Sequence, residues 1–235
     1  MIKLPVIPAV VTLLLLSTFS VAAGDVASFV DLGFSKDGGI YVFAQYGVEE
    51  KTLRPWADLN IVNVPLNDFV PGGRFRYTHS EPIGPVQDGS SALMQLIASN
   101  SAATKRYGLD FFIKGVPIFI SLKNTQDASG ETIEFRDFQN ELYYRAELVP
   151  QVEISGGKLR SSFYINLIRS DVNGISRSYT VGAPSIKRAG ITSYSIKRVL
   201  INPQNTGLIF VIEMTRESAD PYAPDIRYMV EALKF

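Results

Sequence analysis

Hydrophobic and polar positions along the chain follow patterns that are typical of β-strands. Residues 142–149 alternate, with Leu142, Tyr144, Ala146 and Leu148 separated by residues of the opposite face, which predicts a half-buried strand. Residues 40–46 and 208–214 instead form short apolar runs between turn residues, the pattern of a buried strand. The chain is therefore expected to be mainly β, with antiparallel sheets.

Two segments repeat the same order of elements and predict two equivalent three-strand units. The first, residues 31–64, has an apolar run ending at Phe34, a turn at 35–39, a strand at 40–46, a Pro55-Trp56-Ala57 loop and a strand at 58–64. The second, residues 200–230, has a turn at 202–207, a strand at 208–214, a Pro221-Tyr222-Ala223 loop and a strand at 225–230. Gly, Asn and Asp in the turns supply the backbone conformations that a tight hairpin needs. We expect Phe34 and its counterpart Ile201 to be buried equivalently, with the units related by a pseudo-twofold axis.

The segment between the two units contains one predicted helix and several further strands. Residues 69–85 are rich in Pro and Gly and predict an irregular excursion over the surface. A helical period near residues 90–107 predicts one helix, with Asn100 as a polar interruption of its apolar side. Strands and turns then continue to the second unit without βαβ alternation. About ten strands and one helix are expected, in a compact sandwich-like domain or a degenerate propeller.

Residues 1–23 have the pattern of a secretory signal peptide. A Lys near the start precedes an apolar run, and Val21-Ala22-Ala23 fits the small-residue cleavage pattern. A membrane anchor is the alternative, but Pro5 and Pro8 interrupt the apolar run, which is short for a span of about 20 residues. We expect residues 24–235 to form a single periplasmic or secreted β-rich domain, without stable membrane insertion after cleavage.

Composition excludes several kinds of chemistry. With 23 basic and 23 acidic residues, charge gives no argument for a nucleic-acid partner. No Cys is present and His79 is the single histidine, so neither a disulfide, a zinc site nor a Ser-His-Asp triad is expected. The segments 127–131 and 171–174 each begin with Asp but lack the spaced terminal glutamate of a calcium loop, so they are predicted to be turns. We expect no cofactor and no bound metal.

Six motifs along the chain are LGFSKDG, FAQYGV, the Pro-Trp-Ala loop, SSFYI, YTVGAP and the late FVIEM. Through these motifs the chain resembles a family of bacterial predicted secreted proteins of unknown function. The resemblance implies secretion and a β-rich fold, and it brings no catalytic residues. The turn FSKDGG followed by an apolar strand is also similar to a blade of TolB-type and WD40-like propellers, with Lys36 where those blades have Pro.

Trp56 and Tyr222 are the candidate recognition residues because each follows Pro in an equivalent loop. Such a ring either packs on the core, which is the more common fate, or is exposed to a partner. With Arg54 and Asp220 beside them, we expect both rings to contribute to one recognition surface for an envelope protein or polysaccharide. The function expected is a non-catalytic binding module of the cell envelope. The alternative is a carbohydrate-active or other hydrolase. The candidate carboxylates for this activity are Glu49, Asp58, Glu213 and Asp225. A glycosidase needs two carboxylates roughly 5–10 Å apart in an open cleft.

Overall fold

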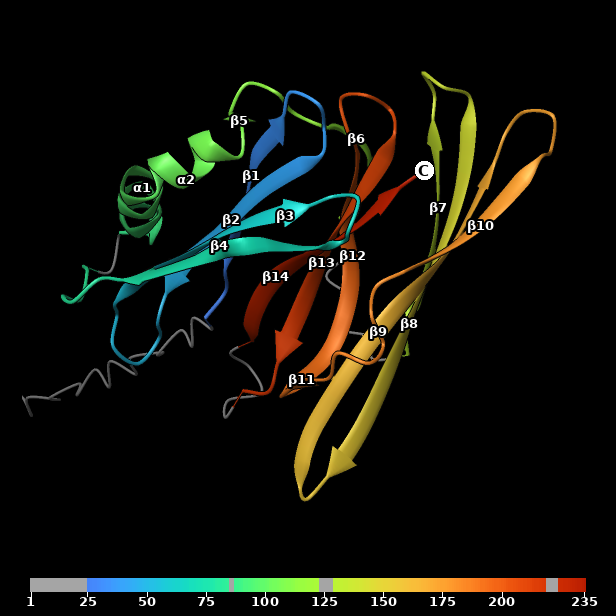
Figure 1. The fold of residues 1–235 in the computed structure, drawn as a ribbon. Helices are drawn as coiled ribbons and strands as arrows, with labels where there is room; N and C mark the ends of the chain where they lie inside the picture. The colour runs from blue at the N-terminus through green and yellow to red at the C-terminus, as the bar shows by residue number, and fades with distance from the viewer. Residues whose placement is uncertain (1–24, 85–86, 123–128, 219–223) are drawn as a thin grey trace, which may run out of the picture.

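The structure is a computed structural model that describes residues 25–84, 87–122, 129–218 and 224–235. Three antiparallel sheets and a pair of helices are stacked side by side (Figure 1). Sheet I has the strand order β4-β3-β2-β1-β5, sheet II has the order β14-β13-β12-β6, and sheet III has the order β10-β9-β8-β7, with β11 paired to β9. The bounds in sheet I are β1 (Ser28–Ser35), β2 (Ile40–Val48), β3 (Pro55–Asn63), β4 (Asp68–Thr78) and β5 (Leu109–Asp110).

The remaining strands form the other two sheets. Sheet II contains β6 (Val116–Ile120), β12 (Ile191–Ile201), β13 (Gly207–Arg216) and β14 (Asp225–Lys234). Sheet III contains β7 (Glu131–Asp137), β8 (Leu142–Ser155), β9 (Lys158–Ser170), β10 (Ser176–Val181) and β11 (Arg188–Ala189). The helices are α1 (Ser90–Ser99) and α2 (Ser101–Arg106), and α1 contacts β2, β3 and β4 of sheet I.

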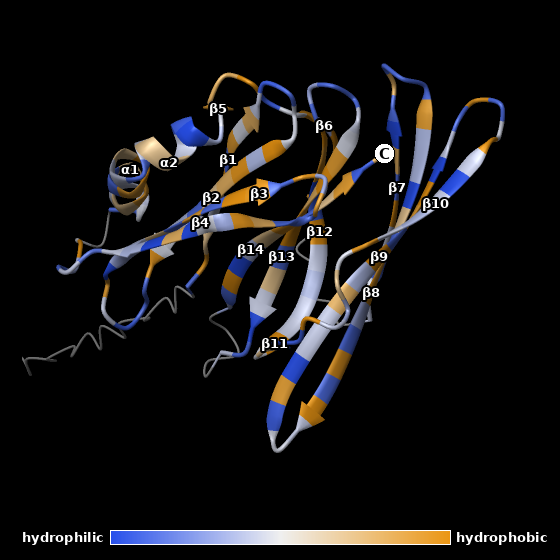
Figure 2. Cartoon of the chain, in the orientation of Figure 1, coloured by the Kyte–Doolittle hydropathy of each residue, from blue (hydrophilic) through white to orange (hydrophobic). Residues whose placement is uncertain are grey.

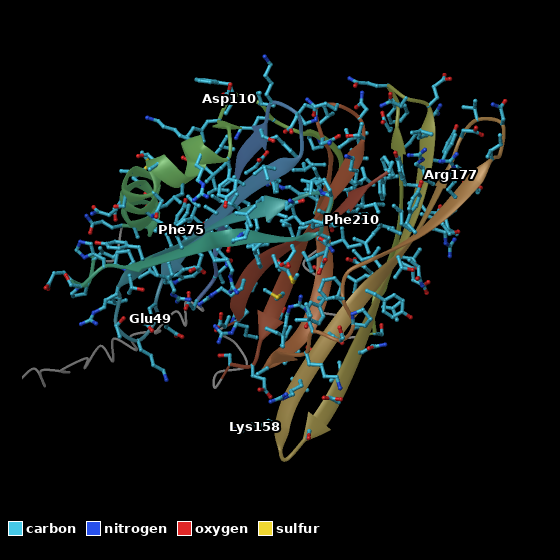
Figure 3. All side chains as sticks on the ribbon, viewed as in Figure 1. Glu49, Phe75, Asp110, Lys158, Arg177 and Phe210 are labelled. Atoms are coloured by element: carbon cyan, nitrogen blue, oxygen red, sulfur yellow. The ribbon has the colours of Figure 1, made fainter. Side chains whose placement is uncertain are left out.

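Three hydrophobic cores hold these four layers together. The first lies between the helices and sheet I, the second between sheets I and II, and the third between sheets II and III. Strand β2 contributes to two of them, because Val42 and Ala44 face the helices while Tyr41 and Phe43 face sheet II. Strand β13 does the same, with Phe210 toward sheet III and Ile209 toward sheet I (Figure 3). A strand that is buried on both faces has no polar side, which explains the continuous apolar runs in the sequence.

Sheet III has one face in solvent, and its sequence pattern differs accordingly. Ala146 and Leu148 of β8 lie in the third core, while Arg145 and Glu147, which alternate with them, are exposed. Figure 2 shows the resulting alternation of hydrophobic and hydrophilic positions along the β8–β9 hairpin. This hairpin extends beyond the rest of the sheet to a tip at Lys158 (Figure 3).

The two repeated units have the same strand order, as the sequence predicts. Strands β1-β2-β3 and β12-β13-β14 are both antiparallel meanders, and a short strand, β5 or β6, pairs with the outer edge of the first strand in each. Phe34 and Ile201 are both buried, at 0% and 2% exposure. Their surroundings differ, because Phe34 packs between sheets I and II whereas Ile201 packs toward sheet III. The layered stacking is a sandwich-like arrangement.

The prediction of an irregular excursion at residues 69–85 was wrong for its first half. Residues 68–78 form β4, which pairs with β3 as the edge strand of sheet I. The Pro and Gly residues lie where the register shifts between Asn60 and Val62 of the partner strand, and Gly72 has a positive φ of 67°. Proline and glycine at a bulge in an edge strand do not disrupt the sheet, so composition alone misidentified this strand.

The predicted single helix is divided into two. The Asn100 side chain donates a hydrogen bond to the Leu96 carbonyl oxygen at 2.8 Å, and the residue has non-helical angles (φ −113°, ψ 19°). A short amide side chain that competes for backbone groups favours such an interruption. Within the described residues, no helix is long and apolar enough to cross a membrane.

Candidate functional site

A groove of about 500 Å³ lies between the first residues of β1 and the face of sheet II. One wall comes from sheet I and the other from β6, β12, β13 and β14, so residues far apart in the sequence meet there. We call this cavity the β1–β12 groove. Its lining residues are Ala27, Ser28, Phe29, Ile120, Ser121, Leu122, Lys197, Arg198, Val211, Glu213 and Tyr228.

Two consecutive cationic residues line the groove because β12 contains a β-bulge. In a regular strand, neighbouring side chains point to opposite faces of the sheet. The register of β12 against β13 shifts between Ile196 and Arg198, so Lys197 is the additional residue. A bulge changes the direction of side chains and is common beside functional sites. Lys197 and Arg198 therefore both reach the same cavity.

Lys197 forms part of a fixed polar cluster with Glu213 and Tyr228. Its Nζ lies 3.1 Å from Glu213 Oε1, and both side chains are only about one-eighth exposed, at 13% and 12%. The Tyr228 hydroxyl donates a hydrogen bond to Glu213 Oε2 at 3.0 Å. Burial, and secondarily the Glu213 charge, raises the pKa of Tyr228, so this hydroxyl keeps its proton. The Glu213 charge is thus matched by one cation and one donor.

Arg198 differs from Lys197 because its charge is not locally paired. Its side chain is exposed, and across the part of the chain that the structure describes, no hydrogen bond or ion pair holds its guanidinium. Its charge acts on Asp31 and Tyr41 of sheet I and on Tyr228 of sheet II. Asp31 lies three residues before Phe34, just as Arg198 lies three residues before Ile201, so opposite charges occupy equivalent positions of the two units.

Asp31 and Tyr41 are polar groups that the fold buries with few partners. Burial raises the pKa of Asp31, and the Lys114 charge opposes this more strongly than the Arg198 charge does. Burial raises the pKa of the completely buried Tyr41 well above its ordinary value. Among the described residues, neither Asp31 Oδ1 nor the Tyr41 hydroxyl has a hydrogen bond of good geometry. These groups lie behind the groove and are not part of its lining.

Apolar residues form the remaining wall of the groove. Phe29 is half-buried, stacks on Phe43 with ring centroids 5.7 Å apart, and meets Tyr228 edge-on at 5.6 Å. Ile120 and Leu122 on the opposite side are 53% and 94% exposed. The groove thus combines a rigid aromatic wall, an exposed apolar lip and one unpaired cation.

Trp56 is not available to a partner, contrary to the expectation of a recognition ring. It is 2% exposed, and its Nε1 donates a hydrogen bond to Asp25 Oδ1 at 3.1 Å. The Arg227 guanidinium lies 4.3 Å from the ring centroid and forms an ion pair with Asp25 at 2.5 Å. Gly47 on β2 allows the ring to lie flat on the sheet, because a Cβ there would be 3.0 Å from the indole. Packing on the core is therefore the role of Trp56.

The other three predicted recognition residues do not form a described surface with Trp56. Arg54 is exposed, and its carbonyl oxygen accepts a hydrogen bond from the Glu49 amide at 2.9 Å. Tyr222 and Asp220 lie outside the described residues. Their contribution to partner binding stays a prediction.

The carboxylates considered for hydrolysis each have partners within the fold. Glu213 is the acidic residue in the groove lining, where Lys197 and Tyr228 hold it. Asp58 contacts Gln45 and Arg76, and Asp225 contacts Arg216 and Arg227. Exposed Glu49 accepts a hydrogen bond from Thr52 at 2.5 Å. A glycosidase needs two carboxylates in one cleft, and the lining of the groove provides one.

A second, smaller cavity of about 90 Å³ contains a buried glutamate between sheets I and II. Glu231 is 5% exposed, Asn67 Nδ2 donates a hydrogen bond to its Oε2 at 2.6 Å, and Arg188 lies 3.8 Å away. Burial raises the pKa of Glu231, and these two neighbours lower it. Asn67 Oδ1 also accepts a hydrogen bond from the Ala232 amide at 2.5 Å, so the cluster fixes the β3–β4 turn to β14.

The described residues contain no group of three or more His, Asp or Glu side chains placed to hold a metal ion. The half-buried His79 accepts a hydrogen bond from the Glu81 amide at Nδ1 in its own loop.

Apart from Glu213, which was one of the candidate carboxylates, the groove residues were not found from the sequence, although one signal was present. Lys197 and Arg198 stand next to each other in an otherwise uncharged strand, and strict alternation would expose only one of them. Phe29 and Tyr228 carried no such signal, because aromatic residues are frequent in all the predicted strands.

The fold and the groove define a layered antiparallel β-sheet protein with an open, partly cationic cavity. The chain belongs to the family described as "predicted secreted protein (DUF2259)", whose family model matches residues 42–234. That description assigns secretion and no activity. No curated protein and no solved structure matches the chain. The expected membership in a secreted family is confirmed, while the likeness to propeller blades rests on the turn motif alone.

Proposed function

We propose that the protein is a non-catalytic binding module of the cell envelope that acts outside the cytoplasm, with the β1–β12 groove as its ligand site. The family description and the signal-peptide pattern of residues 1–23 support an extracytoplasmic location. The volume of the groove, about 500 Å³, lies in the range of small-molecule and segment-binding cavities.

The observation that carries this proposal is the Arg198 guanidinium. Among the described residues the exposed Arg198 guanidinium has no ion-pair partner, so a ligand that supplies hydrogen-bond acceptors can replace the water around it. Lys197, Glu213 and Tyr228 contact one another in the neighbouring wall. A cation beside an apolar wall favours binding of a ligand over acid–base catalysis, which needs a group that exchanges protons.

The absence of Cys from the chain gives a direct test of the site. A Ser28→Cys variant places a single thiol in the groove lining, and Ser178→Cys places one on the exposed strand β10 as a matched control. Each variant carries an environment-sensitive fluorophore and is mixed with separated lipid, polysaccharide and protein fractions of the envelope. We expect one fraction to change the Ser28 signal in a saturable manner and leave the Ser178 signal unchanged. Equal responses at both positions, or none at Ser28, would show that the groove is not the ligand site.

The location has a separate test. N-terminal sequencing of the protein from an extracytoplasmic fraction is expected to start near Gly24. An intact Met1 on material embedded in the membrane would contradict both the processing and the location.

A further inference from the structure

We infer that the β1–β12 groove binds a single-chain amphiphile with one anionic head group, such as a fatty-acid carboxylate. Arg198 would hold the head group, and the apolar wall and lip would cover the chain. This inference rests on the proposed function, because it names the ligand class of the same groove. The lipid fraction is the envelope fraction that it predicts to be active.

Among the described lining residues, the net positive charge of the groove lies at Arg198, because Glu213 balances the charge of Lys197 at 3.1 Å. Asp31, deeper in the fold, is influenced more by Lys114 than by Arg198, and the Lys114 Nζ donates a hydrogen bond to the Asp31 carbonyl oxygen at 2.7 Å. One unpaired guanidinium matches one carboxylate, since its planar N–H groups fit two oxygens. A polyanion would require several unpaired cations along its length.

The apolar residues continue from the groove to the molecular surface. Phe29 forms the inner wall, and Ile120 and Leu122 form the lip, where 53% and 94% of their surface is exposed. Phe112 (95%) and Val116 (41%), earlier in the same segment of the sequence, are also exposed. Exposed apolar side chains at the mouth of a cavity favour an apolar ligand, and a flexible alkyl chain can cover Ile120 and Leu122 without needing hydrogen bonds. The Phe29 ring is packed between Phe43 and Tyr228, which leaves less of its face for stacking on a sugar.

The experiment titrates the labelled Ser28→Cys protein with three probes. Dodecanoate, below its micelle concentration, has both the head group and the chain. Dodecyl maltoside has the chain with a neutral head, and acetate has the head group without the chain. We expect saturable binding of dodecanoate, binding of dodecyl maltoside at least about tenfold weaker, and no response to acetate, because one charge-assisted hydrogen bond contributes about a tenfold change in affinity or more.

Two pairs of variants separate the head-group contact from the chain contact. Arg198→Gln is expected to weaken dodecanoate about tenfold without changing dodecyl maltoside, and Arg198→Lys is expected to retain part of the binding. Arg177→Gln, on exposed strand β10, is the matched control (Figure 3). Ile120→Ser is expected to weaken both chain-bearing probes, whereas Ile154→Ser, which is 76% exposed on the β8–β9 hairpin, is expected to leave them unchanged. Far-UV circular dichroism checks that each variant is folded.

The outcomes distinguish this inference from the proposed function. If an envelope polysaccharide or protein fraction changes the Ser28 signal while dodecanoate does not, the ligand class is wrong and the groove remains the site. If dodecanoate binds equally well to the wild-type protein and to Arg198→Gln, or no better than dodecyl maltoside does, the anionic head group is not recognised and the inference fails. If neither dodecanoate nor any fraction affects the groove, both the inference and the proposed function fail.

Discussion

Replacing Trp56 by Ala should test the role of the largest buried side chain among the described residues. The ring is 2% exposed, packs over Gly47, and contacts both Arg227 and Asp25. Removing a buried Trp side chain costs about 3–5 kcal/mol, because the transfer free energy is lost and a cavity is left. Loss of the indole donor also leaves one oxygen of the Asp25 carboxylate without its partner, so we expect the upper half of that range.

This cost is a large share of the free energy of unfolding, which is about 5–15 kcal/mol for a typical domain. A loss of 1 kcal/mol lowers the melting temperature by about 2–4 °C for a chain of this size. Trp56→Ala should therefore melt about 10–15 °C below the wild-type protein. Trp56→Phe retains most of the ring volume and loses the Nε1–Asp25 hydrogen bond, so it should cost about 1–2 kcal/mol.

The measurement is thermal and urea unfolding followed by far-UV circular dichroism, since Trp56 is the single Trp and its fluorescence is lost in the variants. Dodecanoate binding to Trp56→Phe is measured in parallel and is expected to be unchanged, because Trp56 does not line the groove. If Trp56→Ala melts within about 2–3 °C of the wild-type protein, the structural role of the ring is refuted.

Three further predictions concern Glu231, two glycines and Asp25. The raised pKa of Glu231 means that the folded protein keeps this proton to higher pH than the unfolded chain does, so the free energy of unfolding should fall as pH rises above the ordinary value of 4.5. Glu231→Gln should reduce this pH dependence in urea titrations, and an unchanged dependence would contradict the assignment. Gly33→Ala should lower the free energy of unfolding by about 2–3 kcal/mol, because φ is +112° and a Cβ would lie 2.7 Å from a carbonyl oxygen. Gly72→Ala, with open space around it, should lower it by about 1 kcal/mol. Equal losses of stability in thermal melts would be inconsistent with this reasoning. Asp25→Asn should lower the urea unfolding free energy by about 2–3 kcal/mol through loss of the ion pair to Arg227, and a change below about 0.5 kcal/mol would show that the pair does not stabilise the fold.

Local pattern was sufficient for most of the strands and for the order of the two units. Hairpins read from the sequence form where expected because their turns, such as the one at residues 35–39, depend on local backbone preferences. The Asp37 carboxylate accepts hydrogen bonds from the Ser35 hydroxyl at 2.6 Å and the Gly39 amide at 3.1 Å, all within five residues. Strand β4 was missed because its Pro and Gly are tolerated only through its position at the edge of sheet I.

The functional candidates required the tertiary structure, because pairing and stacking decide which side chains become accessible. The sequence predicted a loop at Pro55-Trp56-Ala57, but Pro55 begins β3, and Asp25 and Arg227 contact the Trp56 ring. Contacts between residues 25 and 227 cannot be inferred from any local window.

The sequence by itself determined that the chain is β-rich, contains two equivalent meanders, and has an N-terminal signal-peptide pattern. These features depend on side-chain period and turn chemistry, which act over a few residues. Only the tertiary structure decided that sheet I is covered on both faces, that a bulge directs Lys197 and Arg198 into one groove, and that Glu213 neutralises the first of them but not the second. Those outcomes depend on register and on the stacking of separate sheets, and a shift of one residue in register would turn each of these side chains to the other face.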